Sequence, residues 1–365
     1  MALSKISNDM FTTISSSSSK PIIINGDQSV SQRTTSVSAS DGVYCTDRIK
    51  HTLSNDGAAT ITQESLSSGN AFTDGFANAL KIDVTTADGS LSAAQKYHFR
   101  YNIEGQDIQH IKKGTASAEK LTLAFWVKAT KTGTNIVRCY TADSDRSCSV
   151  AYTVSSSDTW EKKILNFPAD TAGTVIADDN TVGMTFTWAL AGGSNFSSGT
   201  LATAWASNTS ANDFVGQVNN LDSTSNNFHI TGIQLEIGEF SSTSIPPFQH
   251  ESYGDNFTRC LRYYQDDALY SNSGDTAIME GLLTNDGGNF RHLWKQFIVP
   301  MRAAPTIASV NWRDDTGSST DASTQQGSQL VTYLTADVYG RGNVGSGDSD
   351  TNSIYFHGAT YSAEL

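Results

Sequence analysis

Apolar and polar residues alternate along most of the chain between residues 21 and 250. In one segment Leu80, Ile82 and Val84 alternate with more polar neighbours, and Gly, Asn, Asp and Ser separate this run from the next. The segments expected to be strands are KPIIING, FANALKIDVTTADGS, KYHFRYNIEG, KLTLAFWVKAT, TNIVRCYTA, CSVAYTVSS, TWEKKILNFPAD, TVGMTFTWALA and NNFHITGIQLEIG. A period of two places alternate side chains on one face of a strand. We therefore predict an all-β fold, with an antiparallel β-sandwich of the jelly-roll type over residues 21–250.

The period changes after this region. Apolar residues at spacings of four, four and three predict a short amphipathic linking helix within residues 251–266. The residues of this stripe are Tyr253, Phe257, Leu261 and Tyr264. Alternation returns in residues 267–365, which we predict to be a smaller C-terminal β domain.

Residues 1–20 have a different character. Leu3, Ile6 and Met10 fall on one face if LSKISNDMFTTI is helical, and the run SSSSS that follows is typical of a flexible tether. The segment is either an N-terminal anchoring arm or a disordered tail.

The charge of the chain narrows the classes of partner. The formal net charge is -13, and only 17% of the residues are charged. An acidic chain is repelled by phosphate backbones and by anionic membranes, so we expect neither nucleic acid nor membrane as a partner. The chain also lacks a run of about 18 apolar residues, and its first residues do not resemble a secretory signal.

The side chains that carry catalysis or bind metals form no recognisable motif. None of the four cysteines belongs to a C-x-x-C pair, and Cys139 and Cys148 flank a predicted hairpin turn, where they could face each other or remain free thiols. Glu104 and Asp107 could be an acid and base pair only if both lined one cleft. We expect no enzyme activity and no cofactor. Structural calcium remains possible in the oxygen-rich segments DDNTVG and GSGDSDTN.

Several segments resemble a recurrent family of bacteriophage tail-fibre and appendage proteins. They are LTLAFWVKA, DTWEKKILNFPADTAGT, FHITGIQLEIG, FQHESYGDNFTRCLRYYQ, VPMRAAPTI and YSAEL, in the order found in the family. The resemblance implies a jelly roll similar to carbohydrate-binding modules, then a short helix, then a small β domain. It also implies a homotrimeric virion protein that docks on other tail or capsid proteins through its N-terminus, with the helix stripe available to pack against symmetry mates.

Such a protein would bind host surface polysaccharide, and sugar rings stack on aromatic side chains. The candidate platforms are Trp126, Trp160, Trp188 and Trp205, although each could instead be a packing residue. Two other functions stay open, a purely structural virion subunit such as a tail scaffold or capsid decoration, and a glycan hydrolase. We expect the protein in the virion, assembled in the host cytoplasm and released by lysis.

Overall fold

The computed structural model describes residues 20–266, 290–314, 326–332, 334–341 and 354–365. The chain divides into two compact units, Met1–Tyr253 and Gly254–Leu365, and each is described by itself. The expected residues Leu3, Ile6 and Met10 lie outside the described residues, as does the segment GSGDSDTN. None of the described helices is long and apolar enough to cross a membrane.

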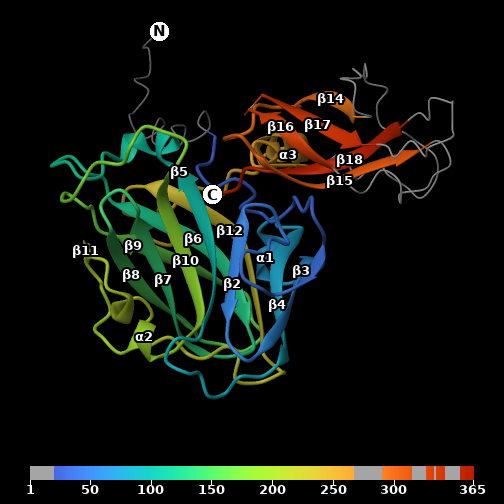
Figure 1. Cartoon of the computed structure of the whole chain (residues 1–365). Helices are drawn as coiled ribbons and strands as arrows, with labels where there is room; N and C mark the ends of the chain where they lie inside the picture. The colour runs from blue at the N-terminus through green and yellow to red at the C-terminus, as the bar shows by residue number, and fades with distance from the viewer. Residues whose placement is uncertain (1–19, 267–289, 315–325, 333, 342–353) are drawn as a thin grey trace, which may run out of the picture. The chain divides into compact units, whose positions relative to one another are not determined.

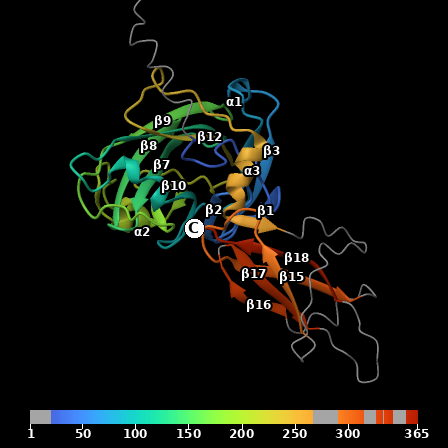
Figure 2. The same cartoon turned by 90° about the horizontal axis from the view of Figure 1, so that it is seen from above.

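The first unit is a sandwich of two six-stranded antiparallel sheets, which confirms the predicted fold class (Figures 1 and 2). The β12 sheet has the order β1-β3-β4-β12-β6-β9, and the β10 sheet has the order β11-β8-β7-β10-β5-β2. The strands of the β12 sheet are β1 (Ser36–Ser38), β3 (Ala58–Ser65), β4 (Asn78–Thr86), β6 (Leu121–Ala129), β9 (Glu161–Phe167) and β12 (Asn227–Ile237). Those of the β10 sheet are β2 (Ile49–Ser54), β5 (Lys96–Glu104), β7 (Gly133–Thr141), β8 (Arg146–Val154), β10 (Val182–Gly192) and β11 (Ala206–Ser207).

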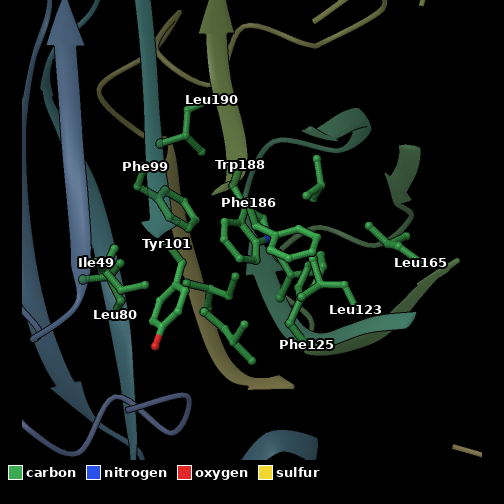
Figure 3. Close-up of a cluster of buried hydrophobic side chains, with 14 of the residues drawn as sticks. Ile49, Leu80, Phe99, Tyr101, Leu123, Phe125, Leu165, Phe186, Trp188 and Leu190 are labelled. Atoms are coloured by element: carbon green, nitrogen blue, oxygen red, sulfur yellow. The ribbon is translucent and has the colours of Figure 1, made fainter. Parts of the chain in front are cut away.

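The predicted alternation places the core between these two sheets. Figure 3 shows aromatic and aliphatic side chains from both sheets meeting there. The indole of Trp188 stacks on Phe99 with ring centroids 5.3 Å apart, and Phe125 of the β12 sheet meets it edge-on at 5.9 Å. This cluster joins the two sheets because its rings come from both of them. Large buried aromatic rings contribute strongly to stability.

One predicted strand is wrong. Residues 20–26 form bends and turns, although Ile23 and Ile24 are buried as their apolar character suggests. The backbone N–H of Ile24 donates to the hydroxyl of Tyr101 at 2.7 Å. Asn25 has a positive φ of 59° and its side chain donates to the carbonyls of Val30 and Asp47, both at 2.9 Å. Asn tolerates this left-handed conformation and its amide replaces the hydrogen bonds of a strand partner.

The hairpin predicted around YTADSDRS is formed by β7 and β8. Cys139 and Cys148 are direct partners across this ladder, and both are buried free thiols. The loops of the sandwich contain short helical segments. They are α1 (Asn70–Thr73), η2 (Gly105–Asp107), η3 (Gln109–Ile111), α2 (Ser194–Ser197) and η4 (Ser210–Asn212).

The second unit begins with α3 (Tyr253–Leu261) and continues as β strands. Its two three-stranded antiparallel sheets have the orders β13-β18-β15 and β14-β17-β16. The strands are β13 (Tyr264–Asp266), β14 (Phe290–Gln296), β15 (Thr306–Asp314), β16 (Gln326–Val331), β17 (Thr335–Arg341) and β18 (Ile354–Ser362). The helix, and a β structure after it, are therefore as predicted.

The predicted helix stripe is only partly correct. Tyr264 is not on the helix, because the chain turns after Leu261 and Tyr264 opens β13. Tyr253 is 61% exposed, whereas Leu261 is buried together with Asn256 and Cys260. Asn256 and Cys260 are four residues apart and share a helix face. The buried face of α3 is thus shifted from the aromatic stripe.

Candidate binding faces

Each sheet of the sandwich has one face in the core and one outer face, because successive side chains of a strand point to opposite sides. We call the outer side of the β12 sheet the β12 face and the outer side of the β10 sheet the β10 face. The main β12-face residues are Glu64, Lys81, Trp126, Lys128, Trp160, Lys162 and His229. The main β10-face residues are Lys50, Lys96, His98, Arg100, Asn102, Arg138, Tyr140, Thr185 and Thr187.

Two of the four predicted tryptophans meet on the β12 face. Trp160 is only 6% exposed and belongs to a buried cluster with Ala71, Phe76 and Ala79. Trp126 packs against the same cluster from β6. Gly69 lies directly over Trp160, since a Cβ added to Gly69 would come within 2.8 Å of the indole. Trp160 therefore offers no open ring face to a ligand in this structure.

Trp126 is partly exposed, but polar neighbours already contact it. Its indole Nε1 donates to Asp74 Oδ2 at 3.0 Å. The ammonium of Lys162 lies 5.9 Å from the ring centroid and 3.4 Å from the same Asp74 oxygen. A sugar ring stacking on Trp126 would have to share or displace Lys162.

The charges of the β12 face are matched in pairs. Lys81 Nζ lies 3.9 Å from Glu64 Oε1, and Lys128 Nζ lies 3.5 Å from Asp158 Oδ1. His229 Nε2 lies 3.0 Å from Glu64 Oε2, and this hydrogen bond is the main reason why the pKa of Glu64 is lowered. Each lysine of this face, Lys162 included, thus has a carboxylate within ion-pairing distance.

The other two tryptophans lie elsewhere. Trp188 is fully buried at the centre of the core, where Figure 3 shows it among Phe99, Phe125 and Phe186. Trp205 lies in the loop before β11, half-buried against the core, and its Nε1 donates to the carbonyl of Pro168 at 2.7 Å. The structure thus brings Trp126 and Trp160 together, but it does not gather all four residues into one site.

The carboxyl groups of the predicted hydrolase alternative are not presented together. Glu104 is buried at the end of β5, whereas Asp107 is exposed in η2. The described residues contain no group of three His, Cys, Asp or Glu side chains that could hold a metal ion. In the described oxygen-rich segment, Asp179 Oδ1 accepts from the hydroxyl of Thr181 at 2.7 Å, as expected for a turn.

The β10 face carries polar side chains in two neighbouring cross-strand rows. Figure 1 shows β2, β5, β10 and β7 side by side, and the register sets which residues align. One row reads Lys50, Arg100, Thr187, Arg138 and Ser149. The next reads Asn102, Thr185, Tyr140 and Ser147. Directly opposed side chains in such a ladder have Cβ atoms about 5 Å apart, so each row is a continuous line of hydrogen-bonding groups.

A loop covers one end of the β10 face. Phe214 packs with Ile136 of β7 and Ala189 of β10, which lie in a third row together with His98. Phe196 and Leu201 pack against this cluster. Figure 1 places α2, which lies in this loop, at one end of the sheet. The apolar cover thus lies over the row that contains His98, Ala189 and Ile136.

Arg138 links the cover to the polar rows. Its Nε lies 2.8 Å from Asp213 Oδ1, and its Nη2 donates to Asn208 Oδ1 at 2.6 Å. Burial raises the pKa of Asp213 to about 6, and the charge of Arg138 opposes that shift. The guanidinium also lies 4.6 Å from the ring centroid of Tyr140, whose hydroxyl donates to Asp145 Oδ1 at 3.1 Å.

Arg100 and Lys96 have, over the residues that the structure describes, no ion pair of the kind that Arg138 forms with Asp213. Arg100 Nε is buried and has no hydrogen-bond partner among the described residues. Within the described ranges, neither cation has a carboxylate within 4.0 Å. Lys96 Nζ instead lies 4.6 Å from the ring centroid of Phe196. Arg100 and Lys96 are therefore cations of the β10 face without an ion pair in the described part of the chain, although the charge of Lys96 also acts to lower the pKa of Asp213.

Sequence reasoning missed the β10 face. Arg100 and Arg138 stand at polar positions of two correctly predicted strands, KYHFRYNIEG and TNIVRCYTA. Their outward direction was readable from the alternation. Their alignment across Thr187 was not, because β10 inserts between β5 and β7 from a distant part of the chain.

No protein-family model matches the chain, and no curated protein sequence matches it. Among solved structures, the enzymatically active domain of bacteriophage CBA120 tailspike protein 4 is similar at 11% identity and a TM-score of 0.31, over 60% of this chain and 21% of that one. A putative sugar-binding protein from Bacteroides thetaiotaomicron is similar at 12% identity and a TM-score of 0.32, over 60% of this chain and 100% of that one.

A family 11 carbohydrate-binding module of a Clostridium thermocellum cellulosomal cellulase is similar at 11% identity and a TM-score of 0.28, over 58% of this chain and 99% of that one. The chain thus has structural similarity to carbohydrate-binding modules and to a phage tailspike domain. At such identities and TM-scores this similarity carries no information about function.

Proposed function

We propose that this protein is a bacteriophage virion appendage, a tail fibre or a similar host-facing fibre, whose sandwich binds host surface glycans reversibly through the β10 face. The observation that carries the glycan proposal is the pair of aligned polar rows with a buried, unpartnered donor at Arg100 Nε. Buried polar groups are nearly always hydrogen-bonded, so an unpaired donor on an outer face favours a ligand that supplies the acceptor. The proposed virion role rests on the family resemblance of the sequence.

The rows can contact a sugar in a simple way. Hydroxyl groups of a saccharide both donate and accept hydrogen bonds, and Thr187 and Tyr140 carry side-chain hydroxyls of the same kind. The hydroxyl of Thr185 is buried and already donates to Asn102 Oδ1 at 2.8 Å. Tyr140 also supplies a partly exposed aromatic ring. We propose binding without turnover, in which a single weak site gains strength because a homotrimer presents several copies to one polysaccharide.

The direct test is binding of the purified full-length protein to polysaccharide extracted from the host surface, with the chain length of the polysaccharide measured afterwards. We expect millimolar to micromolar affinity, about 4–8 kcal/mol per site, and no shortening of the polymer. Thr187→Val, which removes a hydroxyl from the middle of the row, should weaken binding, whereas Thr62→Val on the opposite face of the sandwich should not.

Each contrary outcome points to a different function. If the protein does not bind host polysaccharide at any concentration tested, the structural-subunit alternative is favoured over the proposal. If the polysaccharide is shortened, the protein is a hydrolase. If Thr62→Val weakens binding and Thr187→Val does not, the ligand binds on the β12 face.

A further inference from the structure

The charges of the β10 face indicate more than general glycan binding. We infer that this face selects an anionic saccharide, with a carboxylate-type group held by Arg100 beside Thr187. This inference rests on the proposed glycan binding and specifies the chemical class of the sugar.

The first support is geometric. Thr187 is the cross-strand partner of Arg100 on one side and of Arg138 on the other. Strands in a sheet lie about 4.8 Å apart, so the two arginine backbones are separated by about 10 Å. The guanidinium of Arg138 already contacts Asp213, Asn208 and the ring of Tyr140, so Arg100 is the arginine of this row that is left to bind an anion. Guanidinium groups present paired N–H donors that match the two oxygens of a carboxylate.

The second support is the charge balance. The whole chain has a net charge of -13, yet Arg100 and Lys96 have no ion-pair partner in the described part of the chain. On the β12 face, by contrast, Lys81, Lys128 and Lys162 all have a carboxylate within 4.0 Å. A cation left unpaired in an acidic protein, next to a partly buried surface, favours an anion from outside.

The third support comes from His98, which lies next to Arg100 on the same side of β5 and is 7% exposed. Its pKa is lowered to about 3, mainly by burial and in addition by the charges of Lys96, Arg100 and Arg138. All three cations therefore act on one point of the β10 face. The acidic groups near them are Asp213, which pairs with Arg138, and Asp145, which contacts Tyr140.

The test compares an oligogalacturonate with the same oligosaccharide after its carboxyl groups have been reduced to alcohols. Full-length protein should bind the acidic form about tenfold more tightly, because a hydrogen bond to a charged group is worth more than one to a neutral group. Arg100→Gln should remove most of this preference, and Arg100→Lys should keep part of it. Lys81→Gln, which removes the same charge from the β12 face, should leave the preference unchanged.

Two further measurements keep the test decisive. Melting of Arg100→Gln should match that of the unmodified protein, since Arg100 has no ion pair to lose. If that variant fails to fold, Lys96→Gln is the second variant and should also reduce the preference. Dextran sulfate and neutral dextran serve as a second pair of probes, which separates an arginine site for carboxylates from one that takes sulfate equally well.

The outcomes separate the two proposals. Equal affinity for the acidic and reduced oligosaccharides would overturn the anionic selectivity and leave glycan binding standing. An equal loss of affinity for acidic probes in Arg100→Gln and Lys81→Gln would overturn it too, because the attraction would then be a general property of the charged surface. Absence of binding to every saccharide, host polysaccharide included, would overturn both proposals.

Discussion

The two outer faces of the sandwich each carry one buried histidine, and these histidines have opposite surroundings. His229 on the β12 face lies 3.0 Å from a carboxylate oxygen of Glu64. His98 on the β10 face has a buried Nδ1 without a hydrogen-bond partner among the described residues, and Lys96, Arg100 and Arg138 are its charged neighbours. The same pattern of strands thus produces one face with matched charges and one face with excess positive charge.

The cover over each face explains the difference. On the β12 face, the loop that carries α1 brings Asp74 to Trp126 and Lys162, and aromatic rings seal Trp160. Most charged groups there are paired within the protein, as folding energetics favours, although Nδ1 of His229 is buried without a hydrogen-bond partner among the described residues. On the β10 face the apolar cluster lies over the row of His98, and Asn102, Thr185 and Thr187 of the neighbouring rows are buried too. Unpaired cations beyond that cover contribute nothing obvious to folding, which is why we relate them to a ligand.

The largest effect should come from the sealed face. Trp160→Ala removes an indole that is 6% exposed and leaves a cavity, so the free energy of unfolding should fall by about 3–5 kcal/mol. Denaturant titration measures this loss, and glycan affinity measured below the transition should not change. Trp126→Ala, at a partly exposed site, is the matched variant and should cost less. A Trp160→Ala protein that keeps its stability but loses glycan binding would reverse our assignment of the two faces.

The next effect is a dependence of stability on pH. The pKa of His98 is lowered from 6.5 to about 3, so between these values the unfolded chain binds a proton that the folded protein does not. The free energy of unfolding therefore falls as the pH drops from 6.5 to 3. In His98→Gln this fall should be smaller by about 2–4 kcal/mol, and buried His51, whose pKa is also lowered to about 3, should carry the remaining dependence.

His110→Gln, which replaces a histidine at an exposed position of η3, is the control for this experiment. Asp213 acts in the opposite sense. Since its pKa is raised to about 6, it contributes stability at low pH that is lost as the pH rises through that value. Asp213→Asn should therefore make the gain in stability between pH 4 and 6 steeper. Identical pH profiles for His98→Gln and the unmodified protein would mean that His98 is accessible to protons in the folded state.

The smallest effect should come from a matched pair on the β12 face. Lys162→Gln breaks a partly exposed ion pair with Asp74, so the free energy of unfolding should change by only about 0–1 kcal/mol. The change should shrink further in 0.5 M salt, and affinity for an acidic oligosaccharide should stay constant. A clear loss of that affinity would show that the binding of acidic oligosaccharides is not confined to the β10 face.

The strands in which apolar and polar residues alternate could be predicted from the sequence. Leu80, Ile82 and Val84 occupy the core side of β4 as their alternation indicates. The same rule wrongly made residues 20–26 a strand, since Ile23 and Ile24 are buried in a turn, where the N–H of Ile24 donates to Tyr101 and the side chain of Asn25 donates to the carbonyl of Asp47. Alternation reports which residues are buried, and it cannot report which partner buries them.

The sequence by itself determined a β-sandwich, a short helix and a second β unit, because side-chain period and turn residues act over a few neighbouring positions. Alternation already places Trp126 on the face of its strand opposite to Leu123 and Phe125, but only the tertiary structure showed that Trp188 stacks on Phe99 and that Asp74 contacts Trp126. Only it placed Thr187 between Arg100 and Arg138. The physical reason is that β10 pairs with β5 and β7, which are distant from it in the sequence. Which charged side chains become neighbours on that face therefore depends on the pairing of distant strands, and local sequence patterns do not report it.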